Sequence, residues 1–451
     1  MMKVAKFGGS SVADAEQLEK VARIIQSDKE RRIIVVSAPG KRFANDVKVT
    51  DLLINLGESY KENRQYEREL SLVVERFRSI VTDLNLSDQV IDKIETEIKN
   101  IFASSEAIYS KLEALKAVGE DTLAQILSEY LTSLGMNARY LNPKDAGLIL
   151  SDQPGGAQIL EESFDKIYRL REYDGILVIP GFFGYTSTGK LVTFSRGGSD
   201  ITGSIIAAGV KANLYENFTD VDSVYCVNPT IVNNPKEIAT LTYKEMRELS
   251  YAGFSVFHAE ALIPAVRAEI PVCIKNTNNP NCPGTMIVAK KEIQTGENPV
   301  VGIASDEGFM SLYISKYLMN REIGFGRRLL HILEDEGISY EHTPSGIDDM
   351  SVIMRANQMD ERKERNVIKR IKAELKPDQV HVARGLALIM IVGEGMQRQI
   401  GTAYIATKAL KDANVNIEMI NQGSSEVSLM FGIKEEAVNA AVKSLYQAFF
   451  E

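Results

Sequence analysis

Short apolar runs that stop at glycine or a small polar residue dominate the first half of this chain. Three of them are residues 4–7, 32–38 and 175–180. The first and second are each followed by apolar side chains at helical spacing. Strand, glycine turn and helix in this order predict an open α/β sheet with parallel strands, in which ligands bind beyond the carboxyl ends of the strands. Several polar or small residues fall at that predicted edge, namely Lys6, Gly8, Gly9 and Ser37.

The stretch Phe194–Asp200 joins a predicted strand to an apolar helical run over residues 201–208. Its two adjacent glycines let backbone N–H groups approach an anion, and the helix start adds a partial positive charge. Ser199 is predicted to cap that helix. Arg196 and Asp200 add a fixed positive charge and a carboxylate. The pattern favours a site that holds a phosphate and an acid together, and a turn with a capped helix end is the alternative.

Residues 184–191 match a phosphate-binding P-loop except at the last position, where Leu191 replaces the metal-binding hydroxyl. A strand, not a helix, is predicted to follow. We therefore interpret this segment as a hairpin turn.

Composition excludes several classes of protein. The chain has 451 residues, with 52 basic and 61 acidic side chains and a net charge of -9, which argues against a general nucleic-acid binder. The cysteines lack metal-ligand spacing, so we expect reduced thiols and a cytoplasmic protein; they are Cys226, Cys273 and Cys282. Neither export nor membrane insertion is expected, because no apolar run reaches spanning length.

Two further segments divide the chain. Residues 58–118 are rich in Glu, Lys, Arg and Leu and predict a helical excursion whose charges form a solvated face. A polar segment at 290–299 predicts a domain boundary. Beyond it, the order strand, helix, strand, strand, helix occurs twice, over 309–375 and 386–449, which indicates a duplicated small module. Each copy has a glycine just before its first helix, Gly324 and Gly401.

Lys6–Val12 resembles the N-terminal signature of the aspartate kinases. The remaining blocks of that family follow in its order, as Val36–Ala38, Gly119-Glu120, Gly181-Phe182, Arg196–Asp200 and Thr219–Asp222. The tail resembles a tandem pair of amino-acid-sensing ACT modules. Because several blocks are in register over essentially the whole chain, the resemblance is specific.

The resemblance implies an amino-acid-kinase fold, with three αβα layers and a mostly parallel sheet, followed by two ferredoxin-like βαββαβ ACT modules. The expected catalytic domain spans 1–292 with the excursion at 58–118, and the expected modules span 293–380 and 381–451. The implied reaction transfers the ATP γ-phosphoryl group to the side-chain carboxylate of L-aspartate, the first step toward lysine, threonine and methionine. That carboxylate is ionised near pH 7, so no general base is needed.

The family's functional residues carry over to matching positions here. Lys6 and Asp200 are expected to be catalytic, with Lys6 stabilising the transferring group and Asp200 organising Lys6 or the substrate ammonium; helix capping is the alternative for Asp200. Arg196 would bind the α-carboxylate and Glu120 the ammonium. Ser37, Thr50, Phe182 and Ser199 would complete the substrate pocket. The expected nucleotide site is Lys6, Gly8, Gly9, Ser10, Gly197, Gly198, Thr219, Asp220, Tyr225 and Lys275. Mg²⁺ is expected mainly on the ATP phosphates, because the sequence shows no carboxylate cage.

The chain departs from the family pattern at three positions. Ser255 stands where many relatives have Lys, and Thr230 stands where they have Arg, so the nucleotide contacts differ and Lys275 is a candidate substitute. Ser10 replaces the usual Thr and keeps the hydroxyl.

The helical excursion resembles that of lysine-sensitive aspartate kinases. Lysine is therefore the expected feedback inhibitor, acting through a homodimer or a dimer of dimers joined by ACT modules. The expected effector residues are Met319, Glu322, Gly324, Phe325, Gly326, Ser339 and Glu341. The alternatives are modules that only hold subunits together, a kinase of the same fold acting on acetylglutamate or a nucleotide, and a non-enzymatic amino-acid sensor.

Overall fold

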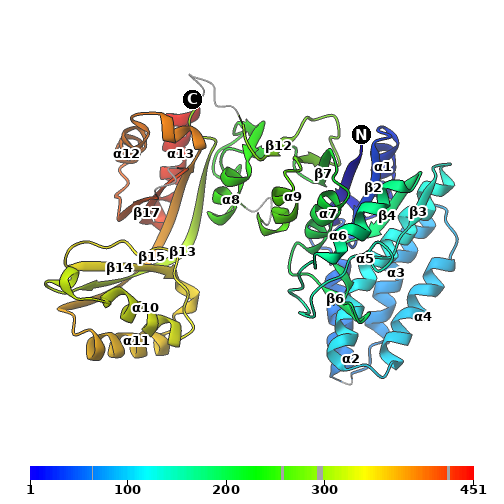
Figure 1. The fold of residues 1–451 in the computed structure, drawn as a ribbon, viewed down its shortest axis with the longest axis horizontal. Helices are drawn as coiled ribbons and strands as arrows, with labels where there is room; N and C mark the ends of the chain where they lie inside the picture. The colour runs from blue at the N-terminus through cyan, green and yellow to red at the C-terminus, as the bar shows by residue number, and fades with distance from the viewer. Residues whose placement is uncertain (63, 255–258, 292–297, 424–426) are drawn as a thin grey trace. The chain divides into compact units, whose positions relative to one another are not determined.

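The computed structural model describes residues 1–62, 64–254, 259–291, 298–423 and 427–451 (Figure 1). Two compact units form. Unit 1 comprises Met1–Val224, Glu237–Tyr243 and Val256–Lys291, and unit 2 comprises Tyr225–Lys236, Lys244–Ser255 and Glu292–Glu451. The predicted boundary between 292 and 293 lies outside the described residues.

Unit 1 is built on an eight-stranded sheet with the order β10-β12-β11-β7-β1-β2-β4-β3. Its strands are β1 (Lys3–Phe7), β2 (Arg31–Val36), β3 (Ala138–Tyr140), β4 (Ile176–Pro180), β7 (Leu214–Thr219), β10 (Thr240–Thr242), β11 (Val272–Asn276) and β12 (Thr285–Val288). Neighbouring strands are parallel except β11 and β12. Phe7 lies beside Val36 and Phe218, so the central strands end at one edge.

Helices cover both faces of this sheet, which gives the predicted three-layer αβα fold. On one face, α1 (Ala15–Gln26), α2 (Val49–Lys61), α3 (Glu67–Asp83), α4 (Gln89–Ala103) and α5 (Ile108–Ser133) share a core with Phe7 and Phe218. Successive strand residues point to opposite faces. Lys6 and Asn217 therefore face the other layer, where α7 (Gly198–Gly209) packs beside α6 (Glu162–Tyr168) and α9 (Ile263–Arg267). Helices α2 to α5 are grouped together in Figure 1.

Helix α5 runs without a break from the excursion through Gly119. The sequence predicts that helical periodicity restarts at this glycine, but the glycine lies inside the helix because the packing there is close. A Cβ at Gly119 would lie 2.8 Å from the Cβ of Ala38. Glycine here brings α5 against the end of β2.

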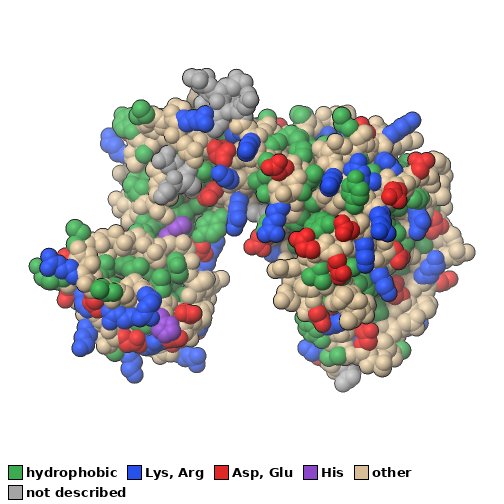
Figure 2. Space-filling view, in the orientation of Figure 1, with side chains coloured by type: hydrophobic (Ala, Val, Ile, Leu, Met, Phe, Trp, Pro, Cys, Tyr) green, Lys and Arg blue, Asp and Glu red, His purple; other side chains and the backbone are tan. Residues whose placement is uncertain are grey.

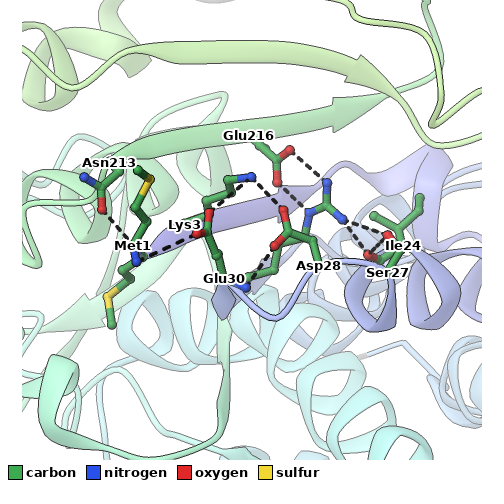
Figure 3. A network of polar contacts seen from close by, with 10 residues as sticks. Met1, Lys3, Ile24, Ser27, Asp28, Glu30, Asn213 and Glu216 are labelled. Atoms are coloured by element: carbon green, nitrogen blue, oxygen red, sulfur yellow. Dashed lines mark hydrogen bonds and ion pairs between the residues drawn. The ribbon is translucent and has the colours of Figure 1, made fainter.

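A buried ion pair holds the edge of the sheet where β1, β2 and β7 begin (Figure 3). Arg31 donates to both carboxylate oxygens of Glu216, at 2.6 and 2.9 Å. Lys3 Nζ lies 2.6 Å from Asp28, and the Met2 backbone N–H donates to Asn213. These contacts join the first strands at the edge opposite the predicted site.

The segment 184–191 forms an antiparallel hairpin of β5 (Phe183–Tyr185) and β6 (Leu191–Thr193), which confirms the hairpin interpretation. Gly189 occupies the turn with a φ of 84°.

Unit 2 contains a five-stranded antiparallel sheet with the order β14-β13-β15-β17-β16. Its strands are β13 (Gly302–Ser315), β14 (Asp349–Arg355), β15 (Gln379–Val392), β16 (Met419–Gln422) and β17 (Ser428–Lys434). Its helices are α10 (Phe325–Asp335), α11 (Glu361–Glu374), α12 (Thr402–Asp412) and α13 (Val438–Phe450), and α8 (Tyr243–Tyr251) begins at the last residue of the unit 1 segment 237–243.

Each of the two long strands, β13 and β15, takes part in both halves of this sheet. The start of β13, Gly302–Asp306, pairs with the end of β15, whereas Phe309–Ser315 pairs with β14. We propose that residues 302–306 belong to the second ACT module, because the end of β15 also pairs with β17. The predicted limit between 380 and 381 then lies inside β15.

The remaining short elements are β8 (Val224–Tyr225), β9 (Glu237–Ile238) and the 3-10 helices η1 (Gly9–Val12), η2 (Arg169–Glu172), η3 (Ala259–Leu262), η4 (Met319–Arg321), η5 (Ala356–Gln358), η6 (Glu394–Arg398) and η7 (Glu435–Ala437). Among the described helices, none has the length and apolar character that a bilayer span requires. The three cysteines are free thiols. Figure 2 shows Lys and Arg side chains interspersed with Asp and Glu over unit 1.

Candidate active site

The carboxyl ends of β1, β2 and β4 continue into small residues that stay bonded to their neighbours. The backbone N–H of Gly8 donates to Phe218, that of Ser37 to Phe7 and that of Gly181 to Val36, at 2.9 to 3.1 Å. The predicted Gly8, Ser37 and Gly181 therefore lie along one edge of the sheet.

Helix α7 begins at this edge through a glycine. Gly197 is its N-cap residue with a φ of 80°, and no side chain caps the helix. The prediction that Ser199 caps α7 is therefore wrong, because the left-handed glycine starts the helix. Ser199 is buried against Gly181 instead, where a Cβ on that glycine would lie 2.6 Å from the Ser199 Cβ.

Phe182 links the end of β4 to α7. Its φ of 76° is uncommon for a bulky residue, and its backbone N–H donates to Thr202 Oγ1 at 3.0 Å. A Cβ at Gly198 would lie 2.7 Å from the Phe182 ring. Gly198 is thus required for close packing, and Gly197 for the left-handed backbone that starts the helix.

A buried ion pair joins the two residues predicted to be catalytic. Lys6 Nζ lies 2.6 Å from Asp200 Oδ1, with only 7% of the Lys6 side chain and 20% of the Asp200 side chain exposed. Asn217 Nδ2 donates to the same carboxylate oxygen at 2.7 Å. Asp200 is therefore held against Lys6, and of the two roles expected for it, organising Lys6 is the one that we propose.

Sequence reasoning missed Asn217, although the alternation of β7 puts it on the face of Lys6. It is 1% exposed and lies beside Lys6 in the pairing of β1 with β7. Its amide also contacts the Tyr215 hydroxyl at 3.2 Å.

Glu120 brings a second carboxylate to this edge from α5. The side chain is 5% exposed, and its Oε2 atom has no hydrogen-bond partner among the described residues. Burial raises the pKa of Glu120 to about 8, while hydrogen bonding to the Ala38 backbone and the positive charge of Lys6 lower it. A buried carboxyl with one unused oxygen, near a lysine, is suited to binding an ammonium group.

Arg196 is not brought to Lys6 by any direct contact. Its side chain is exposed, and it makes no hydrogen bond or ion pair with another described residue. Thr50, in the first turn of α2, and Ser37 are half-buried.

The predicted nucleotide residues of unit 1 follow the same strand ends. Gly9 and Ser10 open η1, and Gly9 accepts the N–H of Gly40 at 2.8 Å. Thr219 ends β7 and donates to Asp220 at 3.1 Å. Lys275, on β11, lies beside Phe218.

The other positions considered for the nucleotide site do not lie at these strand ends of unit 1. Tyr225 belongs to unit 2, as does Thr230, whose hydroxyl donates to Asn228 at 2.9 Å. Ser255 lies outside the described residues.

The prediction of a purely solvated charged face on the excursion is wrong for two of its residues, because their charges are paired inside the fold. Arg76 on α3 is 5% exposed and Glu113 on α5 is 1% exposed. Arg76 Nη1 lies 2.6 Å from Asp46, and Nη2 donates to the Gly40 carbonyl at 2.6 Å. Arg76 thereby holds the loop that follows β2.

The predicted effector residues form one cluster and two separate positions. Glu322 pairs with Lys316 and Arg328, and the Lys316 ammonium lies 5.7 Å from the centre of the Phe325 ring. This cluster holds Met319, Glu322, Gly324, Phe325 and Gly326 at the start of α10. Ser339 instead donates to Gln358, and Glu341 accepts from Tyr251.

Comparisons with known proteins agree with this architecture. Residues 1–276 match the amino acid kinase family, and residues 389–449 match an ACT domain. The chain is 58% identical over 450 residues to aspartokinase 3 of Bacillus subtilis (strain 168), covering 100% of this chain and 99% of that protein. The crystal structure of Clostridium acetobutylicum aspartate kinase superposes with a TM-score of 0.89 at 39% identity, covering 99% of this chain and 100% of that one. Escherichia coli aspartokinase III in complex with aspartate and ADP shares the fold, with a TM-score of 0.78 at 24% identity and all of both chains covered. The chain therefore belongs to the aspartokinases, within the amino acid kinase family.

Proposed function

We propose that this ATP-dependent aspartate kinase transfers the γ-phosphoryl group of ATP to the side-chain carboxylate of L-aspartate at the edge formed by Lys6, Asp200 and Glu120. The observation that carries the proposal is the buried Lys6–Asp200 pair of 2.6 Å at the start of a helix that a glycine opens. A lysine fixed there offers positive charge to a phosphoryl group in transfer. The product is 4-phospho-L-aspartate, and ADP leaves.

The reaction needs two anions to be held in line, because the aspartate carboxylate and the ATP phosphates repel each other. In the proposal, an aspartate side-chain oxygen attacks the γ-phosphorus while the bond to the bridging oxygen of ADP breaks. Lys6 and the N–H groups at Gly197 and Gly198 neutralise the charge that the transferring group carries, whereas the N–H of Gly8 is already bonded to Phe218. Glu120 binds the substrate ammonium, and Arg196 binds its α-carboxylate as a two-pronged donor.

Mg²⁺ would be bound mainly by the phosphates of ATP and would neutralise part of their charge. Lys6 and the backbone N–H groups proposed for this site bind phosphate oxygens and not a metal ion, which fits a Mg²⁺ ion bound by the phosphates. Within the described residues, no group of three or more His, Cys, Asp and Glu side chains is placed to hold a metal ion. Asp220, beside the end of β7, is the carboxylate that we propose to lie near the nucleotide.

Turnover of ATP with aspartate, glutamate and acetylglutamate, measured side by side, tests the proposed reaction. Hydroxylamine traps an acyl phosphate as a hydroxamate, so the assay reports the product directly. We expect hydroxamate with aspartate alone, and Lys6→Met should nearly abolish it while thermal unfolding stays cooperative. Equal turnover in the variant, or preference for acetylglutamate, would contradict the assignment.

For regulation, we propose that lysine binds the start of α10 and inhibits the enzyme. Support comes from the charged cluster there, since Glu322 can bind an ammonium and Lys316 and Arg328 can bind a carboxylate. Escherichia coli aspartokinase III has been crystallised in complex with lysine and aspartate. Equilibrium dialysis with lysine and threonine tests the choice, and threonine binding without lysine binding would reverse it.

We further propose a cytoplasmic homodimer, or a dimer of dimers, joined through the ACT modules. Exposed apolar side chains support such an interface, because Ile323 is 99% exposed directly before the αL glycine at the start of α10. Ile400 is 100% exposed at the matching position before α12. Sedimentation velocity of the wild type and of Ile323→Asp measures the association. An equal mass for both proteins would show that this part of the surface is not the subunit interface.

A further inference from the structure

Glu113 is the most deeply buried charged side chain of the helical excursion, and the chemistry proposed above does not use it. It lies on α5 and is 1% exposed. Its Oε2 atom accepts the Thr193 hydroxyl at 2.6 Å and the Thr193 backbone N–H at 3.3 Å. Its Oε1 atom accepts from Lys116 at 2.9 Å. A charge so buried is stable only because both of its oxygens are bonded.

Glu113 and Thr193 both lie close in the chain to the proposed substrate residues. Thr193 ends β6 and precedes Arg196 by three residues in the chain. Glu113 precedes Glu120 on the same unbroken helix. Seven residues make about two helical turns, so the two acids share one face of α5 about 10 Å apart.

In this arrangement one helix, α5, positions the binding groups for both the α-ammonium and the α-carboxylate of an amino acid. The α-ammonium and α-carboxylate of aspartate are attached to one carbon, so their binding groups must keep a fixed separation. Glu120 is fixed directly by α5, whereas Arg196 is exposed and makes no hydrogen bond or ion pair with another described residue. The hydrogen bonds from Thr193 to Glu113 tie the strand that precedes Arg196 to that helix.

We propose that Glu113 is a positioning residue that sets the spacing between Arg196 and Glu120 and thereby the affinity for the amino-acid substrate. The inference rests on the substrate roles proposed above for Arg196 and Glu120. It assigns a function to the end of the helical excursion: the excursion's last helix aligns the strand that ends three residues before the carboxylate-binding arginine. Loss of the alignment weakens substrate binding before it affects the phosphoryl-transfer groups around Lys6.

The experiment compares Glu113→Met, which removes the acceptor of the Thr193 hydroxyl, with Thr193→Val and the double variant in the hydroxamate assay. A buried hydrogen bond to a charged group holds its partner strongly enough that losing the alignment should weaken substrate binding by about tenfold. We therefore expect KM for aspartate to rise about tenfold in each single variant, with KM for ATP changed less than about twofold. Because both changes break one contact, the double variant should show nearly the same KM as either single variant.

Two further variants of the same hairpin serve as controls. Thr193→Ser keeps the hydroxyl and should keep the wild-type KM. Thr186→Val makes the matched change at a buried threonine near the turn, where the hydroxyl contacts Thr188 at 2.8 Å, and should also keep it.

A purely structural role for Glu113 would give a different result. It would lower the melting temperature without changing KM for aspartate, or would raise both KM values together, and either outcome overturns the inference. Failure of the proposed function is distinguishable, because it would appear in the wild type as turnover of another acceptor. The KM for that acceptor would then still report whether Glu113 positions the site.

Discussion

Replacing Glu120 by Gln should stabilise the free enzyme and at the same time abolish its affinity for aspartate. The glutamate is buried, one of its oxygens lacks a partner among the described residues, and burial raises its pKa to about 8. In the unfolded chain the same carboxyl has its ordinary pKa of 4.5. A group whose pKa is raised by folding favours the fold at low pH, and this stability is lost as the pH rises from 4.5 toward 8.

The magnitude follows from the two pKa values. Each pH unit above 4.5 removes about 1.4 kcal/mol of stability, so ionisation of Glu120 in the unfolded chain destabilises the fold by about 3 kcal/mol at pH 7. Glutamine has nearly the shape of the neutral carboxyl and does not ionise. We expect Glu120→Gln to gain about 1 to 3 kcal/mol at pH 7, and less than about 1 kcal/mol at pH 5, because the difference vanishes near the unfolded pKa.

Urea unfolding of both proteins between pH 5 and pH 8 measures this difference. Addition of aspartate provides the second measurement, since a ligand that binds only the folded state raises its stability by RT ln(1 + L/Kd), where L is the free ligand concentration. Aspartate should stabilise the wild type and leave the variant unchanged. A variant that is less stable than the wild type at every pH, or one that aspartate still stabilises fully, would refute the interpretation that the unpartnered Glu120 oxygen binds the substrate ammonium.

Three further substitutions test other parts of unit 1. Asn217→Ala removes the amide that holds the Asp200 carboxylate at 2.7 Å, so kcat in the hydroxamate assay should fall about tenfold with little change in KM. Arg76→Met removes the hydrogen bond to the Gly40 carbonyl and the ion pair with Asp46, which keeps Arg42 as its partner, so urea unfolding should show a loss of about 1 to 3 kcal/mol together with a higher KM for aspartate. Arg31→Met leaves Glu216 buried without its partner and should lower stability by about 3 to 5 kcal/mol, yet both KM values should stay at the wild-type level below the unfolding temperature, because this pair lies at the opposite edge of the sheet.

The sequence predicts the features that local chemistry determines. The apolar runs that become β1 and β4 end where predicted, because a change from apolar residues to glycine is a local signal, whereas β2 ends at Val36, inside the predicted run 32–38. The same holds for the hairpin that follows β4, where a strand after Lys190 already excludes a P-loop. The confirmed family and fold depend on several such signals in one order.

Contacts between distant residues account for what the sequence did not predict. Arg76 and Glu113 occur in a charged, helix-forming segment that looks solvated throughout, and only the tertiary fold places them inside. Ser199 has the right residue type for a helix cap, but the left-handed Gly197 takes that position. Predicting these features would require knowing which segments of the backbone lie close together in the fold. The spacing of residues along the sequence does not contain that information.

The excursion therefore contributes to the site through its buried charges more than through its surface. Arg76 fixes the loop after β2, and Glu113 fixes the strand before Arg196, so two opposite charges from one helical segment hold the two chain segments that flank the proposed aspartate pocket. A helical insertion that served only for solubility would need neither charge inside, since burying a charge is unfavourable unless it is paired. Because α5 carries Glu113 and Glu120 on one face, displacement of that helix would move the ammonium site and the carboxylate site together. Substitutions that loosen α5 should consequently weaken aspartate binding more than ATP binding, even when they lie far from Lys6.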